Sequence, residues 1–470
     1  MKNFYLKKTT LVVLLIFVLA NLANAQKKDV ISEQNVRAQM DFLASDAMQG
    51  RGSGSQFEQI AAYYLGSMMA QFGVEPAGQK DSSGKSTFIQ TVNITRNSFV
   101  DNPKLTYSAN GATVTLEHGK EILVSRLTAA SASGGLQKIG LDGKPNAGAV
   151  VFIKGSGDAP IPAQTLQGLL SSGAAAILIE ETAQTRANWS RAASRKPSFT
   201  TFSENQPKTS ALITLSKDEA AKIAQLADGT NIEIKGELAP AQKQQTWNAV
   251  GKITGSDKNL SSEIILLSAH LDHLGVRTNV PVEDKIFNGA DDDASGCVAV
   301  IELARVLASD SKPKRTVYFV FFGSEEAGGF GAQYFVDNLD FPKDKLVANL
   351  EFEMIGRPDA KVKPDELWLT GYERSNLGPE LAKQGAKLVQ DPHPEQNFFQ
   401  RSDNYTLARQ GVIAHTVSSF GLHTDYHQSS DEIKTIDFSH MTSAINSMVK
   451  PIQWLINSNF KPVWNEGKKP

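Results

Sequence analysis

The sequence predicts an α/β fold in which a mixed, mostly parallel sheet is sandwiched by helices. From Trp247 onward, short apolar runs alternate with segments of helical periodicity, which is typical of a sheet with helices on both faces. Acidic residues or histidines follow four of these apolar runs. Residues 126–245 differ in character from the chain on either side, and they are predicted to form an inserted small α/β domain.

The first 25 residues have the features of a secretory signal peptide. Three lysines precede an apolar run at residues 11–20, and residues 23–25 (Ala-Asn-Ala) have the form of a cleavage site. The apolar run is too short to span a bilayer, and no later stretch resembles a transmembrane segment. We therefore expect a secreted or periplasmic protein without stable membrane insertion.

The charge balance of the chain is mildly acidic. Its 470 residues include 48 Lys and Arg against 50 Asp and Glu, and removal of the three lysines of the signal peptide leaves a net charge of −5. This balance argues against a nucleic-acid partner. Because Cys297 is the only cysteine, an intramolecular disulfide is excluded, and stability must come from burial. The length is sufficient for two domains with cores of their own.

The N-terminal part begins with two predicted helices, at residues 33–44 and 56–72. The segment between them, residues 45–55 (SDAMQGRGSGS), is a Gly/Ser loop around Arg51, and its composition alone indicates a linker. Residues 90–125 alternate apolar and polar side chains in short runs, which predicts antiparallel strands.

The predicted inserted domain contains short strands and helices. Strands are expected at residues 149–153, 174–179 and 212–215, with helices at 165–170 and 219–226. Ser216 to Glu219 form a capping box at the start of the second helix. Residues 240–246 are interpreted as a Gln-rich linker. Because residues 126–245 contain no histidine, we expect this domain to have no metal or catalytic site.

The C-terminal part alternates strands and helices up to the end of the chain. Strands are predicted at residues 249–253, 264–267, 316–322, 346–353, 367–369 and 412–418, and helices from 297 onward, at 332–338 and at 438–456. Ligands bind at the carboxyl ends of the strands in open α/β sheets. The residues that follow the predicted strands are therefore the candidates for a functional site.

Ionisable side chains are concentrated at these strand ends. They are His270 with Asp272, the triplet Asp291 to Asp293 in the following loop, Glu325 with Glu326, Glu351 with Glu353, and His423, Asp425 and His427. Nitrogen and carboxylate ligands without a thiolate suit zinc, or a similar divalent metal, at a catalytic site. Two histidines and three carboxylates can serve two metal ions when one carboxylate bridges them.

The same region offers the other groups that metal-assisted hydrolysis needs. Glu325 and Glu326 are adjacent on the chain and do not easily bind the same ion, so one can be a ligand and the other a general base. Asp272 fits the partner that orients His270.

These motifs resemble those of the secreted co-catalytic di-zinc exopeptidases, a family that includes bacterial zinc aminopeptidases, glutamate carboxypeptidase and the transferrin-receptor ectodomain. The matching stretches occur in family order: SAHLDHLG, NGADDDASG, FGSEEAGGFGA, NLEFEMIGR, FFQRSDNYTLARQGV and DYHQSSDE. LASDAMQGRGSGS also resembles the N-terminal region of the family, so that the likeness runs from about residue 33 to 456. Through GAVVFIKG and GAAAILI, the inserted segment resembles a protease-associated domain.

The resemblance implies a set of ligands for two Zn²⁺ ions. The ligands would be His270, Asp292, Glu326, Glu353 and His427. Asp292 would bridge the ions, His270 and Glu353 would complete one site, and Glu326 and His427 the other. Since the family usually has aspartate where Glu353 stands, Glu351 is a competitor for this role, although the Glu-Met-Ile-Gly alignment favours Glu353.

The resemblance also implies the residues that act beside the metals. Glu325 would be the general base, Asp272 would orient His270, and Tyr426 matches a position that hydrogen-bonds the tetrahedral intermediate in some members. Arg401 to Asp403 match a family segment, and they either touch substrate or hold the loop.

Other polar residues in the motifs are expected to be structural. His273, His415 and His423 are interpreted as ordinary loop or core histidines. Asp291 and Asp293 are expected to cap and charge-balance the following helix, and Cys297 is expected to be a small core residue.

The implied function is that of a zinc metallopeptidase, an aminopeptidase that acts on peptide or protein substrates. The metallopeptidase domain would comprise residues 27–125 and 246–470. A carboxypeptidase of the same family would need Arg357 or Arg401 to bind the substrate carboxylate. A glutaminyl cyclase would use one zinc, which the five ligands disfavour, and a non-catalytic receptor would be expected to have lost ligands.

Overall fold

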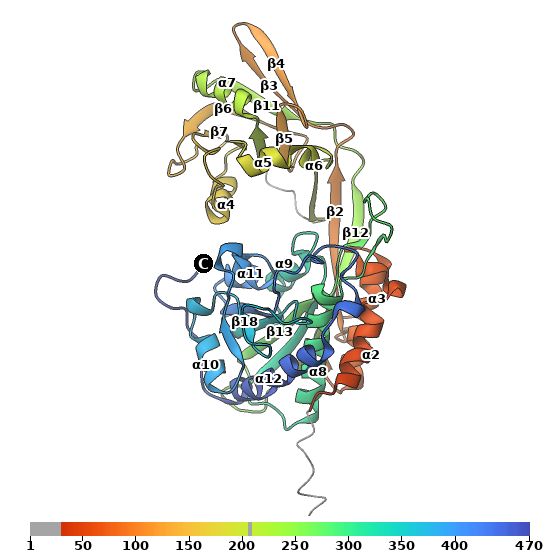
Figure 1. Ribbon diagram of the computed structural model, residues 1–470. Helices are drawn as coiled ribbons and strands as arrows, with labels where there is room; N and C mark the ends of the chain where they lie inside the picture. The colour runs from red at the N-terminus through yellow and green to blue at the C-terminus, as the bar shows by residue number, and fades with distance from the viewer. Residues whose placement is uncertain (1–29, 205–208) are drawn as a thin grey trace, which may run out of the picture. The chain divides into compact units, whose positions relative to one another are not determined.

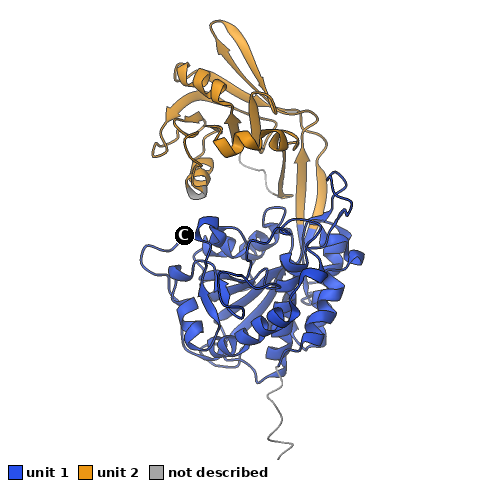
Figure 2. Ribbon diagram, viewed as in Figure 1, with its two compact units in different colours: residues 1–92, 246–470 blue, residues 93–245 orange. Residues whose placement is uncertain are grey.

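The computed structural model describes residues 30–204 and 209–470, and it separates into two compact units (Figure 2). Unit 1 contains the chain up to Val92 and from Thr246 to Pro470, and unit 2 contains Asn93–Gln245. Strands β2 (Ile89–Ser98) and β12 (Gln242–Ile253) carry the chain across the two boundaries. The predicted signal peptide lies outside the described residues. In the described ranges, no helix is both long and apolar enough to cross a membrane.

Unit 1 is built on a mixed sheet with a parallel centre. Its strands follow the order β19 (Leu388–Gln390), β18 (Leu367–Leu369), β20 (Ala414–Ser418), β17 (Leu346–Phe352), β13 (Ile264–His270), β16 (Thr316–Phe322) and β12. Strands β20, β17, β13 and β16 are parallel to one another, whereas β18 and β12 pair with them in antiparallel fashion. The short β1 (Glu75–Pro76) pairs with β12. This arrangement confirms the predicted mixed, mostly parallel sheet.

Helices cover both faces of this sheet (Figure 1). One core contains residues from α2 (Glu33–Leu43), α3 (Gln56–Gln71), α8 (Gly296–Ser309), α10 (Leu377–Lys383) and α12 (Phe438–Asn457), and the other from α9 (Phe330–Asp337) and α11 (Asn404–Ala408). In β13, Ile265 and Leu267 belong to the first core, and Ile264 and Leu266 to the second. Because successive side chains of a strand point to opposite faces, a strand covered on both sides is continuously apolar.

Unit 2 is a separate α/β unit around an eight-stranded sheet. The strand order is β4 (Ala112–Glu117), β3 (Lys104–Ala109), β11 (Asn231–Lys235), β6 (Ser131–Ile139), β7 (Val150–Ile153), β8 (Ala176–Glu180), β10 (Ala211–Leu215) and β5 (Ile122–Leu127). Strands β6, β7, β8 and β10 are parallel. The helices are α4 (Ala163–Ser171), α5 (Ala183–Ala187), α6 (Trp189–Ala193) and α7 (Lys217–Gln225), and β9 (Ser198–Phe202) pairs with β2.

The structure differs from the sequence prediction at two segments, in the domain of one and in the secondary structure of the other. Residues 93–125, predicted to belong to the metallopeptidase domain, are part of unit 2, where β3 pairs with β11 and β5 pairs with β10. Residues 240–246 are not a linker over their whole length, because β12 begins at Gln242. The alternation of side chains predicts a strand, but the sheet that the strand joins depends on distant residues.

The remaining elements are short. They are β14 (Gly275–Val276), β15 (Ile286–Phe287), the π-helical turn η2 (Ala290–Ser295), and the 3₁₀ turns η1 (Asp46–Arg51), η3 (Lys343–Lys345), η4 (Tyr372–Arg374), η5 (Pro394–Gln396), η6 (Phe398–Gln400) and η7 (Ile433–Thr435). Strands β14 and β15 pair with each other in the loop between β13 and α8. This loop and η2 connect β13 to α8.

Candidate metal centre

The candidate site lies at the carboxyl ends of the parallel strands of unit 1. His270 is the last residue of β13, Glu325 and Glu326 follow β16, Glu353 follows β17, and His427 lies in the loop after β20. Asp292 comes from η2, which leads into α8. Because neighbouring parallel strands end at the same edge of a sheet, residues that are far apart in the sequence come together there.

Asp292 is shared by two groups of side chains that could hold a metal ion. One group consists of His270, Asp292 and Glu353, and the other of His273, Asp292 and Glu326, with the ligand atoms of each group within 4.8 Å of one another. His270 Nε2 is 3.1 Å from Asp292 Oδ1. Asp292 therefore stands where the predicted bridging ligand is required.

His427 belongs to the same cluster. Its Nε2 lies 3.2 Å from Asp292 Oδ2 and 3.1 Å from Glu326 Oε1. The structure thus brings together all five residues that the family resemblance implies as ligands.

Glu353, and not Glu351, is the carboxylate that lies with His270 and Asp292. Glu351 is fully buried, and its Oε2 accepts hydrogen bonds from Asn404 N at 2.6 Å and from Thr416 Oγ1 at 3.2 Å. Glu351 therefore anchors the start of α11 to the sheet.

The electrostatics of the cluster favour a bound cation. Burial by itself would raise the pKa of Asp292, but His273, His270 and His427 hold this pKa well below its ordinary value. Burial and Asp292 also oppose ionisation of Glu326, yet His273 and His427 lower the pKa of Glu326 to about 2. The two carboxylates are thus stabilised in their charged form by positive charge nearby, which a bound metal ion would supply.

Several buried polar atoms of the cluster have no hydrogen-bond partner within the described part of the chain. They are His270 Nε2, Asp292 Oδ2, Glu326 Oε1 and both ring nitrogens of His273. An unsatisfied buried polar group costs about 1–3 kcal/mol, so that these atoms indicate a missing partner. Imidazole nitrogens and carboxylate oxygens are ligands that zinc takes. The residues therefore fit two metal ions that share Asp292.

Asp272 contacts His270 mainly through its backbone. His270 Nδ1 lies 3.2 Å from the carbonyl oxygen of Asp272 but 3.9 Å from its carboxylate Oδ1. The carboxylate accepts hydrogen bonds from the backbone N–H groups of Glu325 at 3.0 Å and Glu326 at 3.3 Å. The side chain expected to orient His270 thus holds the two glutamates after β16.

Glu325 lies beside the cluster but in neither ligand group. Burial raises the pKa of Glu325 well above its usual value, and Asp403 adds to this effect against the opposing influence of His270. A carboxyl group in this setting can take up and return a proton.

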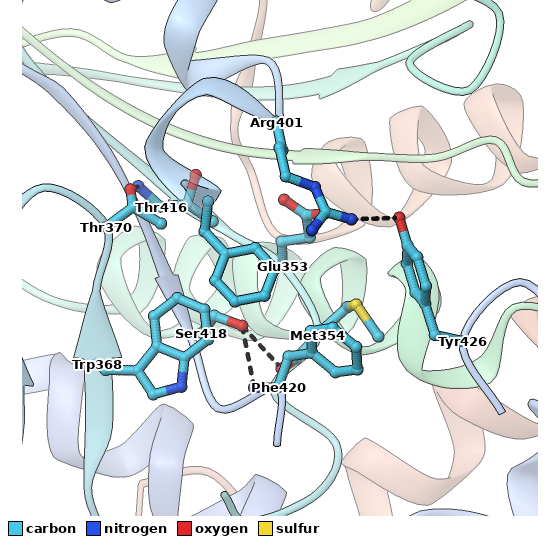
Figure 3. Close-up of a pocket in the computed structure, with 10 residues that line it drawn as sticks. Glu353, Met354, Trp368, Thr370, Arg401, Thr416, Ser418, Phe420 and Tyr426 are labelled. Carbon is cyan, nitrogen blue, oxygen red and sulfur yellow. Dashed lines mark hydrogen bonds between the residues drawn. The ribbon is translucent and has the colours of Figure 1, made fainter. Parts of the chain in front are cut away.

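A pocket opens next to Glu353 (Figure 3). It is lined by Glu353, Met354, Trp368, Thr370, Phe398, Arg401, Thr416, Ser418, Phe420 and Tyr426. The ring of Tyr426 stacks on that of His427 with centroids 3.9 Å apart, and the Tyr426 hydroxyl accepts a hydrogen bond from Arg401 at 3.3 Å. Tyr426 therefore connects the pocket to the ligand cluster.

The three histidines interpreted as ordinary have different surroundings. His415 is a core histidine as expected, because it is buried and lies 2.7 Å from both Ser375 Oγ and Thr370 O. His423 contacts Asp291. His273, however, lies inside the ligand cluster, with Nδ1 2.9 Å from Glu326 Oε1. Its only sequence signal is its place in HLDHLG, three residues after His270.

Arg51 is a buried structural residue and not part of a flexible linker. Its guanidinium donates hydrogen bonds to the carbonyl oxygens of Leu43, Leu271, Asn288 and Gly289 at 2.6–3.0 Å. It thereby ties together both ends of the loop between β13 and η2. The likeness of LASDAMQGRGSGS to the N-terminal region of the exopeptidase family is the signal for this role.

Glu58 supports the other side of the site. It is fully buried, and its Oε1 accepts hydrogen bonds from Ser324 N at 2.9 Å and Thr246 Oγ1 at 2.6 Å. Glu58 thus holds the turn that precedes Glu325. Its place in an amphipathic helical pattern gave no sign of this role.

The remaining acidic residues hold the backbone around Asp292. Asp293 Oδ1 accepts a hydrogen bond from Gly296 N at 3.0 Å, in agreement with the predicted helix cap. Asp431 accepts hydrogen bonds from the backbone N–H groups of Asp291 and Asp292. Cys297 is buried, as expected of a core residue.

Arg357 is engaged by several carboxylates. Its Nη1 is 2.8 Å from Asp425 Oδ2, and other guanidinium nitrogens are 3.7 Å from Asp291 and from Asp431. It is therefore not available to bind a substrate carboxylate.

Comparison with known proteins gives a match over the larger part of unit 1. Residues 248–450 match the family model of Peptidase family M28. This range contains the five implied ligands together with Glu325, His273 and Tyr426. Over these residues, the match to a peptidase family agrees with the resemblance that the motifs indicate.

Two relatives carry aminopeptidase names. The chain is 26% identical over 212 residues to "probable leucine aminopeptidase 2" of Aspergillus oryzae (strain ATCC 42149 / RIB 40). The aligned region covers 43% of this chain and 40% of the relative. It is also 33% identical over 121 residues to "Aminopeptidase" of Pseudomonas aeruginosa (strain UCBPP-PA14). This aligned region covers 25% of this chain and 20% of the relative. The chain thus spans less than half the length of either relative.

A solved structure is similar over nearly the whole chain. "Aminopeptidase from Aneurinibacillus sp. strain AM-1" superposes with a TM-score of 0.54, covering 91% of this chain and 95% of that one at 16% sequence identity. At this identity the likeness concerns the fold.

Proposed function

We propose that this protein is a zinc-dependent aminopeptidase that removes N-terminal residues from peptides. The observation that carries the proposal is the position of Asp292 between two groups of potential ligands at one edge of the sheet. The match of residues 248–450 to a peptidase family and the aminopeptidase names of two relatives support the reaction class.

Five residues would hold two Zn²⁺ ions. His270, Glu353 and Asp292 would bind one ion, and Glu326, His427 and Asp292 the other. When bound, a pair of ions of this kind acidifies water and polarises a carbonyl group.

Glu325 is the general base in this proposal. It is adjacent to the ligand Glu326 but belongs to neither ligand group. Asp272 accepts hydrogen bonds from the backbone N–H groups of both glutamates, which fixes the backbone from which the two side chains extend. Glu325 would accept a proton from the attacking water and return it to the leaving amine.

Tyr426 would stabilise the tetrahedral intermediate. Its ring is stacked on His427, and its hydroxyl oxygen accepts a hydrogen bond from Arg401. The hydroxyl proton remains available to be donated to an oxygen that becomes negative during the reaction.

The pocket beside Glu353 would take the side chain of the N-terminal substrate residue. Trp368, Phe398 and Phe420 supply aromatic walls, which suit an apolar side chain. The carboxylates of the site attract the α-ammonium group at short range. Of the two arginines considered for a carboxypeptidase, Arg357 is paired with acidic residues, and only Arg401 lines the pocket.

The proposal includes secretion of the enzyme and a non-catalytic unit 2. The signal-peptide pattern of the first 25 residues supports a secreted or periplasmic enzyme. Unit 2 corresponds to the predicted protease-associated domain together with residues 93–125, and we infer that it takes no part in the reaction.

A metal count and a substrate panel test the proposal together. Elemental analysis of purified protein should return two zinc ions per chain, and amino-acid p-nitroanilides with a free amino group should be cleaved much faster than their N-acetylated forms. One tightly held ion with full activity would contradict the two-metal assignment. Equal rates on acetylated substrates would contradict the aminopeptidase assignment, and cleavage restricted to peptides with a free carboxyl end would favour the carboxypeptidase.

A further inference from the structure

His273 is a buried histidine that the proposed function does not use. Its side chain is 0% exposed, and neither ring nitrogen has a hydrogen-bond partner among the described residues. Buried polar side chains are hydrogen-bonded in most proteins, so that an unsatisfied one requires an explanation. An imidazole that makes no hydrogen bond, although carboxylate oxygens lie close to Nδ1, indicates a further partner that is neither a side chain nor a backbone group.

The spacing of four atoms identifies the kind of partner. His273 Nδ1 lies 2.9 Å from Glu326 Oε1 and 3.7 Å from Asp292 Oδ2. His427 Nε2 lies 3.1 Å and 3.2 Å from the same two oxygens. In a tetrahedral zinc site with bonds of about 2.0–2.1 Å, neighbouring ligand atoms are about 3.3 Å apart. The four nitrogen–oxygen distances lie on either side of this value.

We propose that His273 is a fourth protein ligand of the second metal ion, together with His427, Glu326 and Asp292. This inference rests on the proposed function, because it requires a metal at this site. The two sites then differ, since the second has two nitrogen and two carboxylate ligands and the first has one nitrogen and two carboxylates.

The surrounding backbone confines the ring of His273 to this position. Gly289 has a φ of 60°, and a Cβ at Gly289 would lie 2.5 Å from His273 Cγ. The backbone N–H of His273 donates a hydrogen bond to Arg51 O at 3.2 Å. The loop held by Arg51 therefore positions a metal ligand as well as the chain around it.

The proposal gives the two ions different properties. Four protein ligands close a zinc site, whereas three leave a position open for water or substrate. The second ion should therefore be held more tightly and exchange more slowly than the first. Its two imidazoles should also favour zinc, cobalt or copper over magnesium or manganese.

The first experiment measures metal affinity in the full-length protein without an activity readout. Metal-free wild type, His273→Gln and the control His415→Gln are titrated with Co²⁺, and binding is followed by visible absorption. Loss of an outer-shell partner weakens metal binding about 10–100-fold, so we expect His273→Gln to weaken binding of the tighter ion by about 100-fold or more. His415→Gln replaces a buried histidine outside the cluster, and it should bind both ions as the wild type does.

The second experiment does not depend on the folding of a variant. X-ray absorption spectroscopy of the zinc-loaded wild type should show three imidazoles shared between the two ions. Two imidazoles, or unchanged affinity for both ions in His273→Gln, would overturn the role of His273 while leaving the two-metal enzyme intact. A wild type that binds no metal would overturn the proposed function and this inference together.

Discussion

Both units contain parallel strands that end side by side, but the acidic residues at these ends have different partners. In unit 2, Glu181 follows β8, and its Oε1 accepts hydrogen bonds from Lys217 N at 3.0 Å and Arg186 Nε at 3.1 Å. In unit 1, Asp292 and Glu326 have only histidines as their ion-pair partners among the described residues. A carboxylate at a strand end is therefore not a site by itself. A site requires buried negative charge that the chain leaves without a permanent cation.

The same contrast extends to the other side chains of unit 2. Among its described residues, no group of three His, Cys, Asp or Glu side chains has the spacing of metal ligands. Its histidine, His118, accepts a hydrogen bond from Val124 N at 2.9 Å through Nδ1.

Asp292→Asn should abolish activity and remove both metal ions. Asp292 is the one residue shared by the two ligand groups, and an amide is a far weaker zinc ligand than a carboxylate. Elemental analysis after dialysis measures the loss. Retention of both ions by this variant would show that Asp292 does not bridge the sites.

Glu325→Gln should lower turnover by a factor on the order of 10²–10⁴ while the metal content stays near that of the wild type. Glu326→Gln should lose metal from the second site, because Glu326 contacts both His273 and His427. The steady-state rate and metal content of the two variants are compared. Loss of metal in Glu325→Gln, with metal retained and turnover lowered in Glu326→Gln, would show that Glu325 is the ligand and Glu326 the base.

Arg51→Ala should destabilise unit 1 by at least about 3 kcal/mol, since four carbonyl oxygens would lose their shared donor. Denaturant unfolding measures this loss, and hydrogen exchange locates it. Protection in unit 2 should not change. A loss of protection confined to unit 2 would contradict the structural role assigned to Arg51.

Tyr426→Phe should reduce kcat by about 10²-fold, because one donor to the developing negative charge is lost. KM should change little, since the ring that stacks on His427 is retained. Steady-state kinetics on an apolar amino-acid p-nitroanilide gives both constants. A rise in KM at constant kcat would instead assign Tyr426 to substrate binding.

Glu181→Gln should have the smallest effect, below about 1 kcal/mol in stability. Arg186, the partner of Glu181 in its ion pair, has a side chain that is 56% exposed, so that solvent screens the interaction. Metal content and turnover should equal those of the wild type. A lost metal ion would show that unit 2 contributes to the centre after all.

Much of unit 1 could be predicted because its local patterns and its tertiary structure agree. The strands predicted at residues 316–322 and 367–369 have the observed bounds, and the helix predicted at 56–72 ends one residue earlier. The two strands are continuous apolar runs, as expected of strands buried on both faces, and the helix has apolar residues at helical spacing. For residues 93–125, the alternation predicts strands correctly, but it contains no information on the sheet that they join.

The sequence by itself determined the α/β fold of unit 1 and the residue types of the centre, because motifs such as SAHLDHLG and NGADDDASG contain the donors that zinc requires. Only the tertiary structure showed which of these residues lie together in the cluster and which contact other groups. The alignment favours Glu353 over Glu351, and the structure supplies the physical reason. Glu351 lies within β17 and accepts a hydrogen bond from Asn404 N, whereas Glu353 follows the strand and lies in the cluster.

The same reason applies to His273 and Arg51. Both residues lie in stretches that resemble the exopeptidase family, but their neighbours along the chain do not show which groups the two side chains contact. The role of Arg51 depends on backbone more than 200 residues away in the sequence, since the carbonyl oxygens of Asn288 and Gly289 accept its hydrogen bonds. For His273, the role arises from Glu326 and His427, which the parallel strands bring to the same edge of the sheet.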